Sequence, residues 1–535
     1  MEITVLRPGV VPEAADAVAV PMRDGVELAT DVYRPDDEAR PVVLVRLPYD
    51  KDGEYCFLPS IARHANARGY TVVVQDVRGK FRSGGATEFG IHEVEDGYDT
   101  IEWITAQAWC TGDVVMWGDS YYGMTQLAAA AGGHPSLKAI APRLTGTLLS
   151  QEVPYPDGTR DVEATSRKVY FSSWYVDRNA YEWPVDWTAR PLRATFEHFF
   201  AELGRRSPNF DAEFGGSAPG LTGHLDRLLA APPVPTLFTV GLFDNCAIYS
   251  WHDLRALLGH EEWCRAVHLR VEALDHENIH LDDVPAVPPG PDPQFLARML
   301  DPALDFFDAV LGGRRGEIAP VHYETCHSET RSATTWPPED ACEVSLHLRA
   351  GDGALRLDER AGASEHASWR HDPDDLVPSA GENPFARLAD RRDLSHVAAR
   401  TDVLTFEGPA AGEPVDHAGP AWVDLALSST VQATNVHVRL LDVDPDGAQL
   451  LVTKGQVHLS EVHSDRPVRV DLQAVCYRLR PGHRWALQLM SSDFPEYVPE
   501  PGDGSHPWEA THFAPSEQTV HLGEPGVSRL VLHRR

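Results

Sequence analysis

The stretch VVMWGDSYYG at residues 114–123 places a serine, Ser120, between a short apolar run and the small-residue segment MTQLAAAAG at 124–132. The apolar run is typical of a buried strand, and the segment after the serine predicts a helix. A serine on a tight strand-to-helix turn presents its hydroxyl above a parallel sheet, and glycines at 118 and 123 permit such a turn. We therefore predict that Ser120 is an activated nucleophile. The alternative is an ordinary strand-to-helix turn in which the serine has no chemical role.

Segments around this turn alternate between strand-like and helix-like patterns. Short β-branched runs at 42–46 and 71–75 are typical of strands that are buried on both faces. Residues 60–68 and 96–107 predict helices. Such an alternation predicts a parallel α/β sheet. The same pattern continues at 137–142, 235–244, 251–259, 266–276 and 293–311.

Two other regions differ from this pattern. Residues 148–234 are rich in aromatic side chains and show little strand patterning, so they predict a helical segment inserted into the α/β core. From 341 onward, short alternating runs such as EVSLHLR and NVHVRLLDV are separated by polar turns, which predicts an antiparallel sandwich of the jelly-roll type. The predicted domains are the α/β core at 1–147 and 235–340, the helical cap at 148–234 and the jelly roll at 341–535.

A nucleophilic serine needs a base, and the base needs a carboxylate that orients it. The chain order in α/β folds with this chemistry is serine, acid, histidine. Asp244 ends the apolar stretch PTLFTVGLFD, and His276 follows a strand-like run. Both are therefore expected at the carboxyl ends of strands, where α/β sites form. The alternative acids are Asp253 and Asp275, and the alternative bases are His252 and His280.

The five residues from His276 to His280 also match the H-E-x-x-H pattern, which binds zinc when it lies in a helix. Here the pattern follows a strand-like run, and prolines at 285, 288 and 289 come soon after it. A long zinc-binding helix is therefore not expected, and we predict neither a metal nor an organic cofactor.

The charge balance excludes some partners. The chain has 535 residues with 47 Lys and Arg against 80 Asp and Glu, a formal net charge of −33. Nucleic acids and anionic membranes both require a basic face, so neither partner is expected. The chain has no apolar run of about 18 residues, so no membrane span is expected. Its first residues lack the basic segment and the apolar segment of a secretory signal, so no such signal is expected. Its seven scattered cysteines form no CxxC pair, which indicates reduced thiols and predicts a cytoplasmic protein.

Several motifs together resemble the cocaine esterase and X-Pro dipeptidyl peptidase group of α/β-hydrolases. They are MRDGVELATDVYRP at 22–35, DVRGKFRSGG at 76–85, EDGYDTIEWITAQAWCTGDVVMWGDSYYG at 95–123, GLFD at 241–244 and GHRWALQLMSSDFP at 482–495. The resemblance covers most of the chain. It implies an α/β-hydrolase core, a helical cap inserted into this core and a C-terminal jelly-roll domain, and it suggests a homodimer.

The resemblance also implies roles for five positions. Ser120 matches the nucleophile, Asp244 the acid and His276 the base. Tyr49, in RLPYDK at 46–51, matches a tyrosine whose hydroxyl joins the oxyanion hole, and the backbone amide of Tyr121 matches the second donor. A neutral phenol on a rigid ring is a suitable hydrogen-bond donor for an oxyanion.

Two features depart from the family pattern. Asp119 precedes the nucleophile, where a small or apolar residue is expected. Its carboxylate could disfavour a nearby oxyanion or bind a cationic group of the substrate. The segment VEALDH that leads to His276 lacks the usual Gly-Pro-Trp, so His280 is kept as the second choice for the base.

The leading functional hypothesis is a serine hydrolase that cleaves a small-molecule carboxylic ester through an acyl-enzyme. The same site could cleave an amide, as an aminopeptidase or an amino-acid ester hydrolase would, with acidic residues holding the ammonium group of the substrate. It could also transfer the acyl group to an alcohol or an amine. A carbohydrate-binding protein is the alternative from another class, because jelly rolls often bind sugars. The acidic candidates are Asp119, Asp177, Glu182 and Asp186, and the aromatic residues expected to line the substrate pocket are Trp174, Tyr175, Trp183, Trp187 and Phe243.

Overall fold

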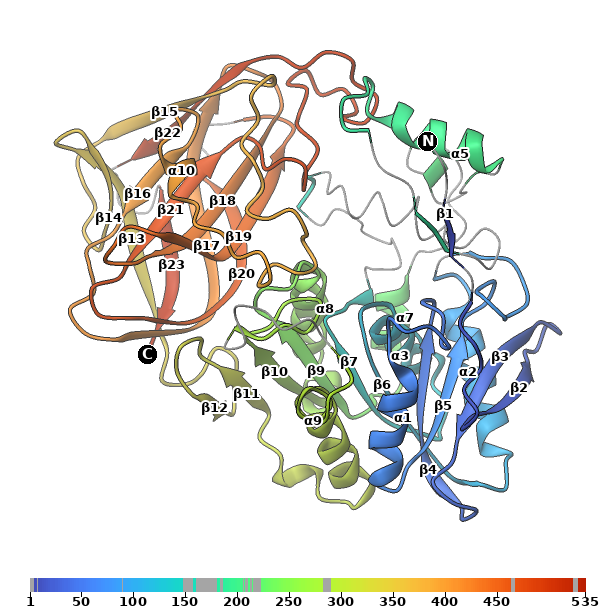
Figure 1. Ribbon diagram of the computed structural model, residues 1–535. Helices are drawn as coiled ribbons and strands as arrows, with labels where there is room; N and C mark the ends of the chain where they lie inside the picture. Colours follow the sequence, from blue (N-terminus) through green and yellow to red (C-terminus); the bar gives the residue numbers. More distant parts are fainter. Residues whose placement is uncertain are drawn as a thin grey trace.

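Two large sheets organise the molecule, a computed structural model (Figure 1). The first sheet lies in the α/β part of the figure, coloured from blue to olive-yellow, and the second lies in the C-terminal part, coloured from yellow to red. The structure describes residues 4–6, 8–88, 90–147, 157–159, 180–182, 186–204, 206, 210–211, 214, 223–281, 290–462, 467–522 and 528–535. Within these ranges, no helix is both long and apolar enough to cross a membrane.

The first sheet has ten strands. They are β2 (Asp16–Pro21), β3 (Glu27–Tyr33), β4 (Arg40–Leu47), β5 (Thr71–Asp76), β6 (Cys110–Asp119), β7 (Leu137–Arg143), β9 (Thr236–Gly241), β10 (Val267–Glu272), β11 (Val321–Glu324) and β12 (Thr330–Ala333). Their order is β12-β11-β10-β9-β7-β6-β4-β5-β3-β2. Pairing is parallel from β11 to β5 and antiparallel at both edges. The predicted parallel α/β sheet is therefore present, with antiparallel strands added at its ends.

Helices cover both faces of this sheet. Successive side chains of a strand point to opposite faces, so strands that are apolar throughout need cover on both sides. They are α1 (Leu58–Ala67), α2 (Glu93–Thr105), α3 (Ser120–Gly132), α7 (His224–Ala230), α8 (Ala247–Gly259) and α9 (Pro293–Leu311), with short 3₁₀ turns at η3 (Trp263–Arg265) and η5 (Arg315–Glu317). Val43 and Val45 of β4 share a buried cluster with α1 and α9. Val42 and Leu44 share the opposite cluster with α2, α3, α7 and α8. The helix expected at 124–132 begins earlier, at Ser120 itself.

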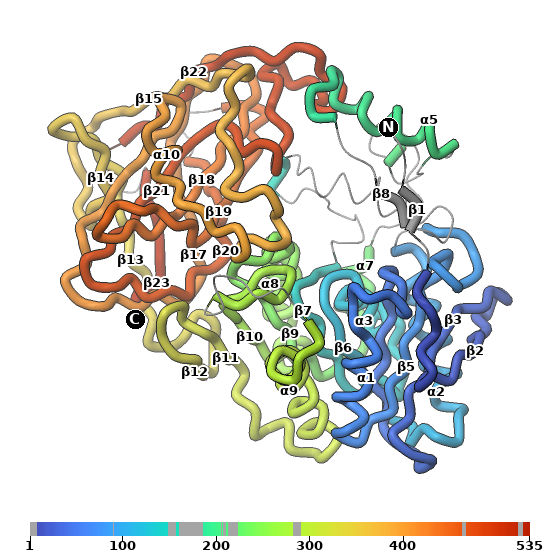
Figure 2. Tube along the Cα trace, in the orientation of Figure 1, coloured from blue at the N-terminus to red at the C-terminus, as the bar shows by residue number. Residues whose placement is uncertain are grey.

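The inserted segment is described only in part. It contains α5 (Arg193–Leu203), α7 and a short strand, β8 (Ala180–Glu182), which pairs antiparallel with β1 (Thr4–Leu6). This pairing of the N-terminal segment with the insertion was not expected from the sequence. Phe196 of α5 packs edge-on against Trp508 of the C-terminal domain, with ring centroids 5.1 Å apart. Figure 2 shows α5 beside this late, red part of the chain.

The second sheet has eleven strands, and its pairs are antiparallel except for one parallel bridge between β14 and β16. Its strands, with one short helix, are β13 (Cys342–Gly351), β14 (Ala354–Asp358), β15 (Glu365–His371), α10 (Ser395–Ala398), β16 (Leu404–Glu407), β17 (Val415–Ser429), β18 (Thr434–Val443), β19 (Gln449–Leu459), β20 (Val468–Leu479), β21 (Arg484–Met490), β22 (Ser516–Leu522) and β23 (Arg529–Arg534). The C-terminal part of the chain is therefore the expected β-rich domain.

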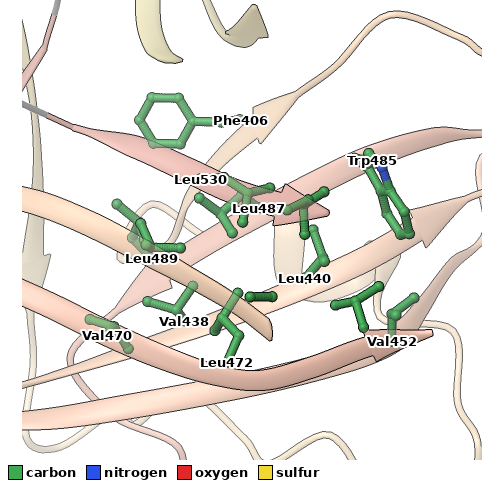
Figure 3. Packing of buried hydrophobic residues seen from close by; sticks show 14 of the residues in the cluster. Phe406, Val438, Leu440, Val452, Val470, Leu472, Trp485, Leu487, Leu489 and Leu530 are labelled. Atoms are coloured by element: carbon green, nitrogen blue, oxygen red, sulfur yellow. The ribbon is translucent and has the colours of Figure 1, made fainter. Parts of the chain in front are cut away.

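The core of this domain is formed by alternate side chains of its strands. Val438 and Leu440 of β18 meet Leu487 and Leu489 of β21 in one buried cluster (Figure 3). β12 ends at Ala333 and β13 begins at Cys342. We propose the boundary between the α/β core and the C-terminal domain in this connection, near residue 341, and the jelly-roll type of the domain stays a prediction.

Candidate active site

Ser120 lies at a sharp turn between β6 and α3. Its φ of 51° is in the left-handed region that non-glycine residues rarely adopt. A Cβ added to Gly118 would lie 2.1 Å from the ring of Tyr122, and one added to Gly123 would lie 2.4 Å from Thr145 Cγ2. Glycine is therefore required on both sides of the serine. The side chain of Ser120 is only partly buried, so the strained turn presents its hydroxyl at the carboxyl edge of the sheet.

Asp244 and His276 come together at the same edge. Asp244 follows β9 and His276 follows β10, and these two strands pair in parallel. His276 Nδ1 lies 2.7 Å from Asp244 Oδ1, and the two side chains are 8% and 0% exposed. The backbone N–H of Cys246 also donates to Asp244 Oδ1, at 2.9 Å. The carboxylate is thus held in place to orient the imidazole ring.

The environment of His276 favours its charged form. Burial of the imidazole acts to lower its pKa, but the neighbouring Cys246 and Asp244 outweigh burial, so the pKa lies well above the ordinary value. An imidazolium forms when a histidine takes a proton from a serine, and a buried carboxylate stabilises that cation. No hydrogen bond joins Ser120 to His276 in the part of the chain that the structure describes.

Tyr49 faces Ser120. Its hydroxyl lies 3.5 Å from Ser120 Oγ and accepts a hydrogen bond from the backbone N–H of Tyr121. Burial raises the pKa of Tyr49 well above the ordinary value, so the phenol stays neutral and keeps its proton to donate. The side chain of Tyr121 points elsewhere, because its hydroxyl donates to Glu93 Oε1 at 2.7 Å. The hydroxyl of Tyr121 is therefore not available at the site, and its backbone N–H stays the predicted second oxyanion donor.

Asp119, whose role the sequence left open, is fully engaged by protein groups. Its Oδ1 pairs with Arg143 Nη1 at 2.8 Å, and its Oδ2 accepts from Asn278 Nδ2 at 2.8 Å. The residue is 4% exposed. Arg143 pairs with this carboxylate and also lies 3.7 Å from Glu272, so both oxygens of Asp119 are occupied by protein groups. Asp119 thereby ties the nucleophile turn to the loop that carries His276.

The alternative acids, Asp253 and Asp275, both accept hydrogen bonds from loop residues. Asp253 accepts from the hydroxyl of Thr147 at 2.8 Å and also from its backbone N–H. Asp275 accepts from the backbone N–H groups of Glu277 and Ile279 within its own loop. Both carboxylates are therefore occupied, and Asp244 is the acid that meets a histidine at the sheet edge.

The alternative bases are likewise paired elsewhere. His252 lies 3.5 Å from Asp253, and His280 Nε2 lies 2.8 Å from Glu324. Residues 276–280 form a turn closed by a bridge between Leu274 and His280, not a helix. The H-E-x-x-H pattern therefore does not place His276 and His280 on one helical face.

The C-terminal domain contributes a contact that the sequence did not reveal. Phe385 lies in the polar stretch between β15 and α10, and its ring centroid is 5.2 Å from that of His276. Its carbonyl accepts from the N–H of Glu277 at 3.2 Å, and the N–H of Leu388 donates to Asp275 Oδ2 at 2.9 Å. The second domain therefore holds the histidine loop from outside. No local sequence signal marks this contact, because it joins residues more than 100 positions apart.

The structure describes the side chains of two of the five aromatic residues that are expected to line the pocket. Trp174, Tyr175 and Trp183 lie outside the residues whose side chains are described. Trp187 packs edge-on against Phe494, with centroids 6.1 Å apart, at the junction of α5 and the C-terminal domain. Phe243 is buried beneath the guanidinium of Arg391, 5.5 Å from its ring. Phe243 also lines a cavity next to Asp244, and the place of Trp187 and Phe243 in a substrate pocket stays a prediction.

A serine on a strained strand-to-helix turn of a parallel sheet, beside a buried aspartate–histidine pair, defines a serine hydrolase of the α/β-hydrolase class. Residues 24–256 match the family model of the X-Pro dipeptidyl-peptidase (S15 family), and residues 314–531 match its C-terminal non-catalytic domain. The chain is 30% identical to cocaine esterase from Rhodococcus sp. (strain MB1 Bresler), over 90% of this chain and 91% of that protein. The chain belongs to the cocaine esterase and X-Pro dipeptidyl peptidase group of α/β-hydrolases.

Solved structures show the same fold along the whole chain. An aminopeptidase from a marine sediment archaeon, Thaumarchaeota archaeon, superposes with a TM-score of 0.82 at 23% identity and covers 98% of both chains. An α-amino acid ester hydrolase superposes with a TM-score of 0.78 at 22% identity, over 99% of this chain and 98% of the other. The expected family and fold class are confirmed.

Proposed function

We propose that Ser120, His276 and Asp244 form a catalytic triad that hydrolyses carboxylic esters of small molecules. The observation that carries this proposal is the 2.7 Å hydrogen bond between His276 and Asp244 at the sheet edge where Ser120 also lies. The 30% identity to an enzyme named as an esterase supports the choice of an ester.

In the proposed reaction, His276 takes the proton of Ser120 as Oγ attacks the ester carbonyl. Asp244 keeps the imidazole in the required tautomer and stabilises its charged form. The hydroxyl of Tyr49 and the N–H of Tyr121 donate to the oxyanion of the tetrahedral intermediate. The protonated His276 gives its proton to the departing alcohol, and water, activated by the same histidine, then releases the acid from the acyl-enzyme.

Amide hydrolysis is the second candidate, and one observation disfavours it for free-amine substrates. Asp119, an acidic residue beside the nucleophile, is already bound to Arg143 and Asn278. Asp186, another acidic candidate, accepts from Thr188 within its own exposed turn. Asp177 and the side chain of Glu182 lie outside the described residues.

Labelling with a fluorophosphonate tests the nucleophile directly. The expected result is a single adduct that peptide mapping places on Ser120, and no adduct on Ser120→Ala. An adduct on another residue, or none on the folded parent protein, would refute the proposed triad. Rates with p-nitrophenyl esters, with the matching anilides and with added alcohols then separate ester hydrolysis from amide hydrolysis and acyl transfer.

Some predictions from the sequence stay proposals. They are a homodimer, a cytoplasmic location, the absence of nucleic acid and membrane partners, and a pocket lined by Trp174, Tyr175, Trp183, Trp187 and Phe243. Light scattering on the purified chain tests the dimer, and substitution of each aromatic residue, read out as KM for a bulky ester, tests the pocket.

A further inference from the structure

Cys246 lies against the proposed acid and base, although the reaction does not use it. It follows Asp244 by two residues in the turn between β9 and α8, and it is 2% exposed. Its side chain hydrogen-bonds with His276. One donor atom each from Asp244, Cys246 and His276 lie within 4.8 Å of one another. A thiol, an imidazole and a carboxylate therefore meet at one buried point.

A second observation concerns the acid itself. Asp244 Oδ1 accepts from His276 and from the backbone of Cys246, but Oδ2 is buried and has no hydrogen-bond partner within the described residues. A buried carboxylate oxygen without a partner is costly. The cluster thus contains an unused ligand atom of the type that binds cations.

We propose that Asp244, Cys246 and His276 form an inhibitory site for a thiophilic divalent cation such as Zn²⁺. Cysteine sulfur, histidine nitrogen and carboxylate oxygen are the usual zinc ligands, with bonds of about 2.0–2.3 Å. A tetrahedral site of this size has donor atoms roughly 3.3–3.7 Å apart. The three side chains, already within 4.8 Å, approach this separation.

Binding needs no change of oxidation state. The cation takes a lone pair from the imidazole, one from the carboxylate and one from the thiolate. The thiol proton and the extra proton of a charged His276 both leave to solvent. Inhibition rests on the proposed function, because a metal-bound His276 can no longer receive the proton of Ser120. Mg²⁺ and Ca²⁺ prefer oxygen ligands and are expected not to bind here.

Metal binding is measured first on the Ser120→Ala protein, which is inactive under the proposed function but keeps all three ligands. Equilibrium dialysis against Zn²⁺, followed by metal analysis, is expected to show one site that Mg²⁺ does not occupy. Adding Cys246→Ala is expected to weaken that site at least about tenfold. Cys246→Ser, which keeps a polar side chain, is expected to weaken it as well. Unchanged Zn²⁺ affinity in both variants would overturn the proposal.

Inhibition is then measured on the active chain, with each variant normalised to its own metal-free rate. Zn²⁺ is expected to inhibit ester hydrolysis, and a chelator is expected to restore it. Cys246→Ala raises the half-inhibitory concentration at least about tenfold. The control Cys264→Ala, which removes an exposed thiol, leaves it unchanged. Equal sensitivity of Cys246→Ala and the parent would overturn the inhibitory role.

The two proposals fail in distinguishable ways. Zinc binding that depends on Cys246, in a chain that hydrolyses no ester, would remove the proposed function and keep the metal site. Ester hydrolysis without Cys246-dependent zinc binding would keep the function and remove the metal site.

Discussion

Asp119 Oδ2 accepts a 2.8 Å hydrogen bond from Asn278 Nδ2, and this bond joins the residue before Ser120 to a residue two positions after His276. The nucleophile and the base come from different strands, β6 and β10. A direct bond between their flanking residues therefore sets how the two turns face each other. Arg143, 2.8 Å from the other oxygen of Asp119, neutralises the carboxylate that makes this link.

We expect Asn278→Ala to lower kcat about tenfold or more with a smaller change in KM, because small displacements of catalytic groups cost rate. Asn278 has a φ of 60°, so alanine also introduces backbone strain. Asn278→Gly is the matched control, since it accepts this φ but lacks the amide. Steady-state kinetics with a p-nitrophenyl ester measure both. Full activity in the glycine variant would show that the bond to Asp119 has no catalytic effect.

Tyr49→Phe is expected to lower kcat about 10²–10³-fold, the usual loss for one oxyanion donor. The ring and its packing remain, so the melting temperature should change little. Tyr33→Phe is the matched control: the hydroxyl of Tyr33 is also buried but has no hydrogen-bond partner within the described residues. A kcat for Tyr49→Phe equal to that of the control would contradict the role of the phenol.

Gly123→Ala is expected to destabilise the chain by about 1–3 kcal/mol and to reduce activity. The new Cβ would lie 2.4 Å from Thr145 Cγ2 and 3.1 Å from the carbonyl oxygen of Arg143, which forces the nucleophile turn to move. Gly259→Ala, at the end of α8, has nothing within 4 Å of the added Cβ and serves as the control. Urea unfolding and ester kinetics on both variants test this. Equal stability of the two variants would show that the turn tolerates a side chain.

Asp76 is expected to make the stability of the chain depend on pH. Burial raises its pKa from 3.8 to about 7. Between these values the folded chain binds more protons than the unfolded chain, so the free energy of unfolding falls as pH rises from about 4 to about 7. A pKa difference of one corresponds to about 1.4 kcal/mol. Asp76→Asn removes this contribution. The free energy of unfolding of the variant, relative to that of the parent, should therefore be higher at pH 8 than at pH 4.

The measurement is urea unfolding of the parent and of Asp76→Asn at pH 4, 6 and 8. Asp37→Asn, at a fully exposed side chain, controls for the loss of one negative charge. A difference between parent and Asp76→Asn that stays constant over this range would contradict the expectation.

Much of the fold could be predicted because strand and helix patterns are local. The runs at 42–46 and 71–75 lie within β4 and β5, and the segment around 293–311, where the α/β pattern continues, forms α9. The strand β8 was missed, because its partner β1 lies about 175 positions away and no alternating pattern marks three residues. Ser120 could be proposed from the sequence because the turn, the strand and the helix around it are contiguous.

The sequence by itself determined the α/β core, the β-rich C-terminal domain, the family and the serine at the strand-to-helix turn, since each depends on periodicity or motifs within short stretches. Only the tertiary structure decided that Asp119 binds Arg143 and Asn278, that Phe385 packs on His276 and that Cys246 meets the acid–base pair. The physical reason is that strand order and register bring distant loops to one sheet edge. Whether a carboxylate is neutralised or free then depends on side chains from strands that are far apart in the chain.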